Sequence, residues 1–250
     1  MRGLERKALR TPVRACGSAA LLALALAAPG AAQRVADDAG WREQREGLVA
    51  ERLAPWGISD SATLAAMRAV PRHEFVPPEQ RDLAYEDIAL PIAQGQTISQ
   101  PFVVAMMTQV IRPRAGLRVL EVGTGSGYQA AVLAAAGCRV WTIEIFKVLA
   151  EDARARLARL GYTGVAVRHG DGYAGWPEAA PFDAVVVTAA ADSIPPALLA
   201  QLAPRGRLVM PVGDPATEQA LVLVEKDAKG RIRSRKVLPV RFVPLLRGVR

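Results

Sequence analysis

Cysteine and histidine are scarce in this 250-residue chain, which contains two of each. Cys16 and Cys138 cannot build a disulfide framework or a cysteine-rich zinc site. His73 and His169 lie 96 residues apart and do not form the ligand pair that zinc hydrolases carry on one helix. The sequence therefore argues against a disulfide-stabilised scaffold and against a metallohydrolase, and we expect no metal site.

Aromatic residues are also few, at 5% of the chain, whereas 51% of residues are hydrophobic and 22% are charged. This composition is typical of a globular protein and is too apolar for a disordered chain. The formal net charge is +8, and half of it falls in residues 1–32. The remainder has no block of Lys and Arg with interleaved aromatics, so we expect no nucleic-acid partner.

Residues 1–32 begin with basic residues, continue with an Ala- and Leu-rich stretch and end in small residues. This order is typical of a secretory signal peptide with a cleavage site near Ala32, and export would place the mature chain in the periplasm. The apolar stretch is shorter than the roughly 20 residues that span a bilayer, so we expect no stable membrane insertion. A disordered extension or a misassigned start codon is the alternative.

The N-terminal part of the mature chain has helical spacing of apolar residues. We expect helices over 41–56, 61–70 and 99–111. Residues 71–98 contain four prolines and are predicted to form a loop with one short helix.

From residue 118 onward, predicted strands and helices alternate. Strands are expected at 118–122, 139–145, 165–168, 182–188 and 206–212, with two further strands at 219–224 and 237–243. Helices are expected at 127–136, 146–160 and 195–202. This order predicts an α/β fold with a doubly wound, mostly parallel Rossmann-like sheet, helices on both faces and an N-terminal helical extension.

A glycine-rich turn joins the first of these strands to the next helix, with the sequence VLEVGTGSGY over 119–128. Glycines let the backbone turn sharply and approach a ligand closely. Tyr128 stands where a dinucleotide fingerprint needs its third glycine, which disfavours a pyrophosphate. Glu121 would also repel a phosphate, but it suits a cationic ligand such as the sulfonium and ammonium groups of S-adenosyl-L-methionine. A tight turn that binds no ligand is the alternative.

Acidic residues follow the next two strands as well. Glu144 lies 21 residues after Gly123, where a carboxylate can accept hydrogen bonds from both hydroxyls of a ribose. Asp171 lies between two glycines and could accept a hydrogen bond from an adenine amine. The simpler alternatives are a solvated charge for Glu144 and an ordinary Asp-Gly turn for Asp171. Together, these positions predict a ligand site at the carboxyl ends of the strands.

Short motifs spread over residues 41–246 carry a more specific resemblance. They are AVPRHEFVP at 69–77, QGQTIS at 94–99, LEVGTGSGYQ at 120–129, GDG at 170–172, FDA at 182–184, LVMPVG at 208–213 and VRFVPL at 240–245. These motifs resemble the protein-L-isoaspartate O-methyltransferases, a family of class I methyltransferases, and the run at 94–99 is the most family-specific. The signal-like leader departs from the family, whose familiar members are cytoplasmic.

The resemblance implies an activity. The chain would transfer a methyl group from S-adenosylmethionine to the free α-carboxylate of L-isoaspartyl residues in damaged proteins or peptides. The ester would then close to a succinimide, part of which reopens to aspartate. A carboxylate is already ionised at pH 7 and needs no general base. We expect one methyltransferase domain over 33–250 that acts as a monomer, with 33–112 on the substrate side and 113–250 binding the cofactor.

The family pattern also implies roles for individual residues. Ser99 matches the active-site serine, whose hydroxyl would orient the substrate carboxylate, although a residue at a helix start before Pro101 is the alternative. The residues expected to shape the substrate pocket are Gln96, Thr97 and Ile98. The residues expected to bind the cofactor are Glu121, Gly123, Thr124, Gly125, Glu144, Asp171 and Gly172.

Two other classes of function stay open. The first is a methyltransferase that acts on a small acid or on RNA, and the second is a non-catalytic binding protein that kept the fold. The run at 94–99 and the lack of a basic face argue against the first. The intact acidic and glycine positions argue against the second.

Overall fold

The computed structural model describes residues 31–214 and 218–248. The leader predicted over 1–32 lies outside the described residues except for its last two, which begin the first helix. In the described part of the chain, no helix combines the length and the apolar character needed to cross a membrane.

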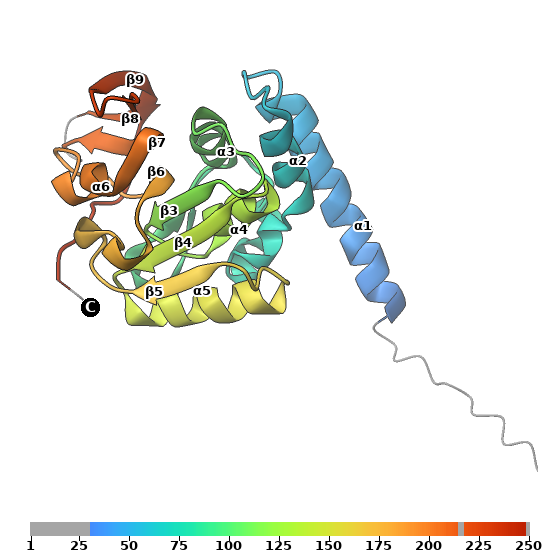
Figure 1. The fold of residues 1–250 in the computed structure, drawn as a ribbon. Helices are drawn as coiled ribbons and strands as arrows, with labels where there is room; N and C mark the ends of the chain where they lie inside the picture. The colour runs from blue at the N-terminus through green and yellow to red at the C-terminus, as the bar shows by residue number, and fades with distance from the viewer. Residues whose placement is uncertain (1–30, 215–217, 249–250) are drawn as a thin grey trace, which may run out of the picture.

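A seven-stranded sheet forms the centre of the molecule, in the order β5-β4-β3-β6-β7-β8-β9 (Figure 1). The strands are β3 (Arg118–Val122), β4 (Arg139–Glu144), β5 (Ala166–His169), β6 (Phe182–Val187), β7 (Leu202–Gly213), β8 (Gln219–Lys226) and β9 (Ile232–Val240). Strands β3 to β7 pair in parallel, whereas β8 and β9 pair antiparallel at one edge. The mostly parallel α/β sheet predicted from the sequence is therefore confirmed.

Helices cover both faces of this sheet. Successive strand residues point to opposite faces, and apolar residues on each face pack against helices. In β3, Val119 packs into the apolar core that includes α4 (Tyr128–Ala135), whereas Leu120 packs into a second core that includes α6 (Pro196–Gln201). The third crossover helix, α5 (Lys147–Arg159), follows β4. This crossover pattern brings the carboxyl ends of β3, β4, β5 and β6 to one edge of the sheet.

The N-terminal extension comprises α1 (Ala31–Leu48), a π-helical turn η1 (Val49–Leu53), α2 (Ser61–Ala69) and α3 (Pro101–Val110). The helix predicted over 41–56 is present, but it begins earlier and its last turn is π-helical. Ala31 and Ala32, which the sequence analysis assigned to the leader, are strong helix formers and extend α1. Asp60 caps α2 by accepting a hydrogen bond from the amide of Thr63 at 2.7 Å.

Residues 71–98 are more ordered than the predicted loop with one short helix. They contain three short 3₁₀ turns and a two-stranded antiparallel sheet of β1 (Leu90–Pro91) and β2 (Thr97–Ile98). Strands of two residues are too short to show the alternation that identifies a strand in a sequence.

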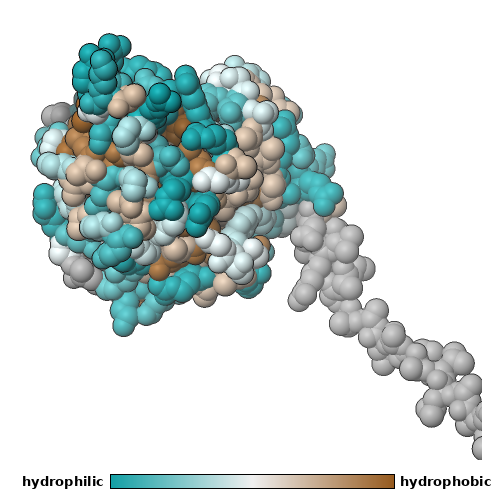
Figure 2. All heavy atoms as spheres, viewed as in Figure 1, coloured by the Kyte–Doolittle hydropathy of each residue, from teal (hydrophilic) through white to brown (hydrophobic). Residues whose placement is uncertain are grey.

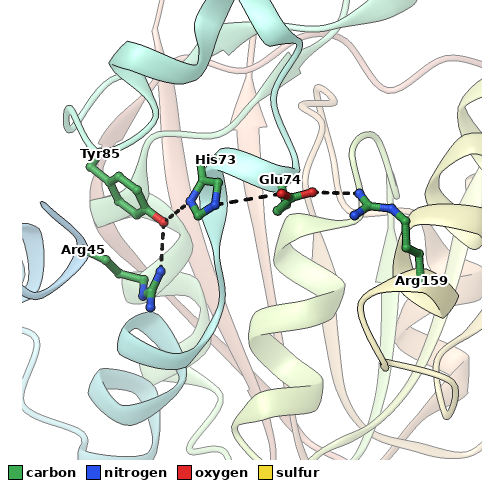
Figure 3. A network of polar contacts seen from close by, with 5 residues as sticks. All are labelled: Arg45, His73, Glu74, Tyr85 and Arg159. Atoms are coloured by element: carbon green, nitrogen blue, oxygen red, sulfur yellow. Dashed lines mark hydrogen bonds and ion pairs between the residues drawn. The ribbon is translucent and has the colours of Figure 1, made fainter. Parts of the chain in front are cut away.

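A polar network connects α1 to α5 through the segment between α2 and α3 (Figure 3). Arg45 donates to the hydroxyl of Tyr85 at 3.1 Å, and that hydroxyl lies 2.7 Å from Nδ1 of His73. On the other side of the network, Glu74 lies 4.0 Å from Nε2 of His73 and pairs with Arg159 at 2.9 Å. The network attaches the N-terminal extension to the α/β core.

Candidate active site

A cleft opens at the carboxyl ends of β3, β4 and β6. Its empty volume, including the part open to solvent, is about 740 Å³, which is typical of a small-molecule site. The loops after these strands line it, together with segment 96–99 beside β2 and segment 243–246 after β9. The cleft therefore lies where the sequence predicted a ligand site.

The glycine-rich turn after β3 follows a path that side chains would block. Gly123, Gly125 and Gly127 have positive φ values of 96°, 51° and 88°. A Cβ atom on Gly123 would come within 2.3 Å of Oγ1 of Thr188, which donates a hydrogen bond to the carbonyl of Gly123 at 2.6 Å. Gly123, Thr124 and Gly125 all line the cleft, as predicted. The turn thus exposes backbone to the cleft at close range.

Glu144, at the end of β4, also lines the cleft and is almost fully buried. Its Oε2 accepts a hydrogen bond from the amide of Gly125 at 2.8 Å, and its Oε1 accepts one from the amide of Phe146 at 3.0 Å. Each carboxylate oxygen can accept a second hydrogen bond. The carboxylate is therefore held in place and keeps acceptor capacity for ligand hydroxyls.

Glu121 lies below the cleft and does not line it, in contrast to the direct contact with a cationic ligand that the sequence suggested. Its side chain has no exposed surface, and neither carboxylate oxygen forms a hydrogen bond of normal geometry with the described residues. Burial raises the pKa of Glu121 to about 8, and Glu144 adds to this rise while the Thr142 hydroxyl opposes it. The hydroxyl of Thr142 is hydrogen-bonded to that of Thr124, which reaches the cleft.

Asp171 is another residue that the structure does not bring into the cleft. Its Oδ1 accepts a hydrogen bond from the amide of Tyr173 at 2.9 Å, and its Oδ2 accepts one from the amide of Gly248 at 3.2 Å. Asp171 therefore fixes the loop after β5 against the C-terminal segment. Each of its oxygens can accept a second hydrogen bond, so the adenine contact stays a prediction. Gly172 does line the cleft, where a Cβ atom would come within 2.3 Å of Cγ1 of Val122.

The segment predicted to bind the substrate faces the cleft from the opposite side. Gln96, Thr97, Ile98 and Ser99 all line it. The hydroxyl of Ser99 forms no hydrogen bond with the described residues, and the N-cap position of α3 is the next residue.

Asp87 supplies the acceptor at the start of α3 that Ser99 would provide if it were a cap. Its Oδ1 accepts a hydrogen bond from the amide of Phe102 at 2.7 Å, and its Oδ2 accepts one from the side-chain amide of Gln100 at 2.8 Å. Ser99 therefore does not cap the helix, and its hydroxyl is available to a ligand.

The lining residues that the sequence analysis missed include Thr188, Phe146 and segment 243–246. Thr188 is the last residue of the predicted strand 182–188. A polar residue at the carboxyl end of a strand could have indicated that Thr188 lines the ligand site. Phe146 follows Glu144 and has no such signal. Segment 243–246 joins the cleft because Pro244 forms a parallel bridge with Ala190 after β6, a long-range contact that local sequence does not reveal.

Comparison with known proteins identifies the family. The family model for protein-L-isoaspartate(D-aspartate) O-methyltransferase (PCMT) matches residues 43–250. The chain belongs to this family. The resemblance inferred from the sequence motifs is thus confirmed.

Individual members of the protein-L-isoaspartate O-methyltransferase family are similar to this chain over most of their length. Protein-L-isoaspartate O-methyltransferase 2 of Syntrophobacter fumaroxidans is 52% identical over 236 residues, which cover 91% of this chain and 95% of the relative. The enzyme of Methylorubrum extorquens is 55% identical over 222 residues, which cover 89% of this chain and 95% of the relative.

Solved structures of the family share the fold. One protein-L-isoaspartate O-methyltransferase has a TM-score of 0.72 and 31% identity, and the match covers 80% of this chain and 65% of that one. The Plasmodium falciparum protein, solved in complex with S-adenosyl-L-homocysteine, has a TM-score of 0.68 and 26% identity, with 81% of this chain and 98% of that one covered.

Proposed function

We propose that this chain transfers a methyl group from S-adenosylmethionine to the free α-carboxylate of L-isoaspartyl residues in proteins and peptides. The observation that carries the proposal is the pairing of two features across one cleft. The glycine turn and the fixed carboxylate of Glu144 form one side, and the unengaged hydroxyl of Ser99 faces them from the other. The family membership of the chain supports the same activity.

The residues on the cofactor side fit S-adenosylmethionine. Gly123 and Gly125 line the cleft with backbone and carry no side chain that would enter it, and Glu144 offers acceptor lone pairs to ribose hydroxyls. When bound, S-adenosylmethionine supplies a methyl group on a positively charged sulfur. The carboxylate of Glu144 gives this part of the cleft a negative potential, which favours a cation.

On the substrate side, Ser99 donates a hydrogen bond to one oxygen of the isoaspartyl carboxylate and thereby aligns it. The carboxylate is ionised at neutral pH, so transfer forms a carbon–oxygen bond and breaks a carbon–sulfur bond without any proton movement. The described residues that line the cleft accordingly include no His, Cys, Asp or Lys. Apolar residues at 243–246 limit the water around the merging charges.

A peptide assay tests the activity. The purified chain should transfer label from methyl-labelled S-adenosylmethionine to an isoaspartyl peptide and not to the same peptide with ordinary aspartate. Equal labelling of both peptides, or labelling only of RNA or of a small carboxylic acid, would favour another methyltransferase activity. Binding of the cofactor without transfer to any of these would favour the non-catalytic alternative.

Glu144→Gln should weaken S-adenosylmethionine binding measured by calorimetry. A side-chain amide has one acceptor oxygen, so its NH₂ group would face an N–H of Gly125 or Phe146 and one acceptor for the ligand would be lost. We expect the Kd to rise roughly 5- to 30-fold, about 1–2 kcal/mol. Glu151→Gln, which changes an exposed residue of α5, is the control and should bind normally. Unchanged affinity in Glu144→Gln would remove this residue from the cofactor site.

We further propose that the enzyme is exported to the periplasm through residues 1–32 and acts as a monomer. The charge and apolar pattern of the leader supports export, and the large exposed hydrophobic residues fall singly along the chain between Trp56 and Ile232, which supports a monomer. N-terminal sequencing of the protein from its native host should begin near Gln33. Recovery of a form beginning at Met1 in the cytosol alone would contradict export, and elution as a dimer would contradict the monomer.

A further inference from the structure

A basic groove lies at the end of the sheet opposite the cleft. The amino ends of β3 and β6, the start of β7 and the β8–β9 hairpin border it, and it is open, with about 1530 Å³ of space shared with solvent. Seven cationic side chains and three carboxylates line it. Figure 2 shows hydrophilic residues at the end of the molecule where Figure 1 places β8 and β9. The sequence analysis expected no basic face, because these arginines are spread over residues 112–233 and only the fold gathers them.

The three carboxylates of the groove are already engaged. Glu225 forms an ion pair with Arg207, and Asp227 pairs with Arg231 at 2.7 Å. Asp183 accepts a hydrogen bond from the backbone amide of residue 118 at 2.9 Å. The groove nevertheless keeps an excess of positive charge, because seven cationic side chains face three carboxylates.

Four arginines of the groove lack such partners. Arg112, Arg114, Arg205 and Arg233 form no ion pair and no side-chain hydrogen bond with any residue that the structure describes, and all four are exposed. Lys226 is engaged with backbone carbonyls instead. Arg233 adds to the effect of Arg231 in lowering the pKa of Asp227, so it is partly compensated. The remaining excess of guanidinium groups around one groove favours an anionic ligand.

The backbone at two of these arginines is unfavourable for any residue other than glycine or asparagine. Arg112 and Arg205 have φ values of 57° and 64°, and they are two of the three non-glycine residues with positive φ in the described chain. Arg112 directly follows the C-cap of α3, a position that glycine usually occupies. Strained positions of this kind concentrate at functional sites, which points to a role for the two arginines.

Strand β9 connects the groove to the cleft. It begins at Ile232, between Arg231 and Arg233 of the groove, and ends at Val240, shortly before segment 243–246 of the cleft. It is also the terminal strand of the sheet. Nine residues at about 3.3 Å each span roughly 30 Å, so one extended polypeptide alongside β9 would reach both sites.

We propose that the basic groove binds acidic segments of the polypeptides whose isoaspartyl residues are methylated in the cleft. This proposal rests on the proposed function, because it assigns the groove to the same substrates. Carboxylates of Asp and Glu side chains complement this excess of guanidinium groups. A nucleic acid fits less well, because no aromatic residue on which bases could stack occurs among the described residues that line the groove.

The test uses two isoaspartyl peptides of equal length, one with a Glu-rich tail about ten residues from the isoaspartyl residue and one with a Ser-rich tail. The variant is Arg112→Gly with Arg205→Gly, which removes two charges and relieves the backbone at both positions. Its KM for the Glu-tailed peptide should rise about threefold to tenfold at low salt. Its KM for the Ser-tailed peptide and its kcat should stay unchanged. Its thermal stability should not decrease. The preference of the wild type for the Glu tail should disappear at high salt.

Two further variants distinguish the effect of charge in the groove from the effect of the protein's net charge. Arg112→Lys with Arg205→Lys keeps the charge and should keep the low KM for the Glu-tailed peptide. Arg42→Gln with Arg52→Gln removes two charges from exposed positions of α1 and η1. This pair should also keep the low KM for the Glu-tailed peptide. If this second pair raises the KM as much as the glycine pair does, or if the wild type does not prefer the Glu tail, the proposal is overturned.

Direct binding provides a readout that does not depend on methyl transfer. Fluorescence anisotropy of a labelled Glu-rich peptide without isoaspartate should show weaker binding to the glycine pair than to the wild type, whether or not the enzyme assay succeeds. Equal affinity for both proteins would refute the groove as an acidic-peptide site. Stronger competition by a single-stranded oligonucleotide than by unlabelled peptide would refute it in favour of nucleic acid. Failure to methylate the Ser-tailed peptide with intact peptide binding would count against the proposed function alone.

Discussion

Glu121→Gln should flatten the pH dependence of the free energy of unfolding between about pH 5 and pH 8. Burial raises the pKa of Glu121 from 4.5 to about 8, so within this range the folded chain binds a proton that the unfolded chain has released. This contribution to stability is fully present below the unfolded pKa and is lost as the pH rises through the folded pKa. At about 1.4 kcal/mol per pH unit, the loss in the wild type is on the order of 4 kcal/mol at most. Glutamine does not titrate and removes this term.

Urea unfolding at a series of pH values measures the effect. Glu178→Gln is a suitable control, because Glu178 is exposed and its pKa is lowered by its own backbone amide and by Arg168, so it stays ionised throughout the range. The control should keep the wild-type slope. An equally steep slope in Glu121→Gln would show that Glu121 is ionised in the folded protein at neutral pH.

The same carboxyl group links pH to cofactor binding. A cation in the cleft stabilises the ionised form of Glu121 and lowers its pKa, so binding of S-adenosylmethionine should strengthen as the pH rises toward 8. The Glu121→Gln enzyme should lack this dependence. Calorimetry at pH 6, where Glu121 of the free protein is protonated, and at pH 8, close to its pKa, separates the two proteins.

The cofactor side of the cleft could be predicted from the sequence because its information is local. A short, largely apolar strand, three closely spaced glycines and a carboxylate at the end of the next strand identify the turn after β3 and the position of Glu144. The same local pattern also predicted Asp171, but it could not show that two backbone amides donate to that carboxylate or that it lies outside the lining of the cleft. A strand-end carboxylate is visible in a sequence, whereas its partners depend on the fold.

Features that depend on long-range contacts could not be predicted. The hairpin of β1 and β2 is too short to show a period, and segment 243–246 reaches the cleft only through its bridge to the chain after β6. The basic groove has the same origin, because Arg112 and Arg205 meet only after β7 is placed in the sheet. Binding and docking surfaces built from distant segments leave no periodic signal in the chain.

Ser99→Ala should lower the rate of methyl transfer roughly 10- to 150-fold, about 1.5–3 kcal/mol, while the affinity for S-adenosylmethionine stays nearly unchanged. The expected loss is that of one hydrogen-bond donor to the charged substrate carboxylate. Ser99 lines the cleft, and its hydroxyl forms no hydrogen bond with the described residues, so its removal leaves no protein group unpaired. Turnover with an isoaspartyl peptide and calorimetry with the cofactor measure the two quantities on one preparation.

Thermal unfolding distinguishes this role from that of a helix cap. Ser99→Ala should not change the stability, because Asp87 and not Ser99 accepts the hydrogen bond from the amide of Phe102 at the start of α3. Asp87→Asn is the matched variant, and weakening of this charged acceptor should cost about 1 kcal/mol of stability. A loss of rate far above 150-fold in Ser99→Ala would indicate that Ser99 moves a proton, which an ionised carboxylate does not require. Full turnover in a folded Ser99→Ala enzyme would instead show that the substrate carboxylate is oriented by other groups of the cleft.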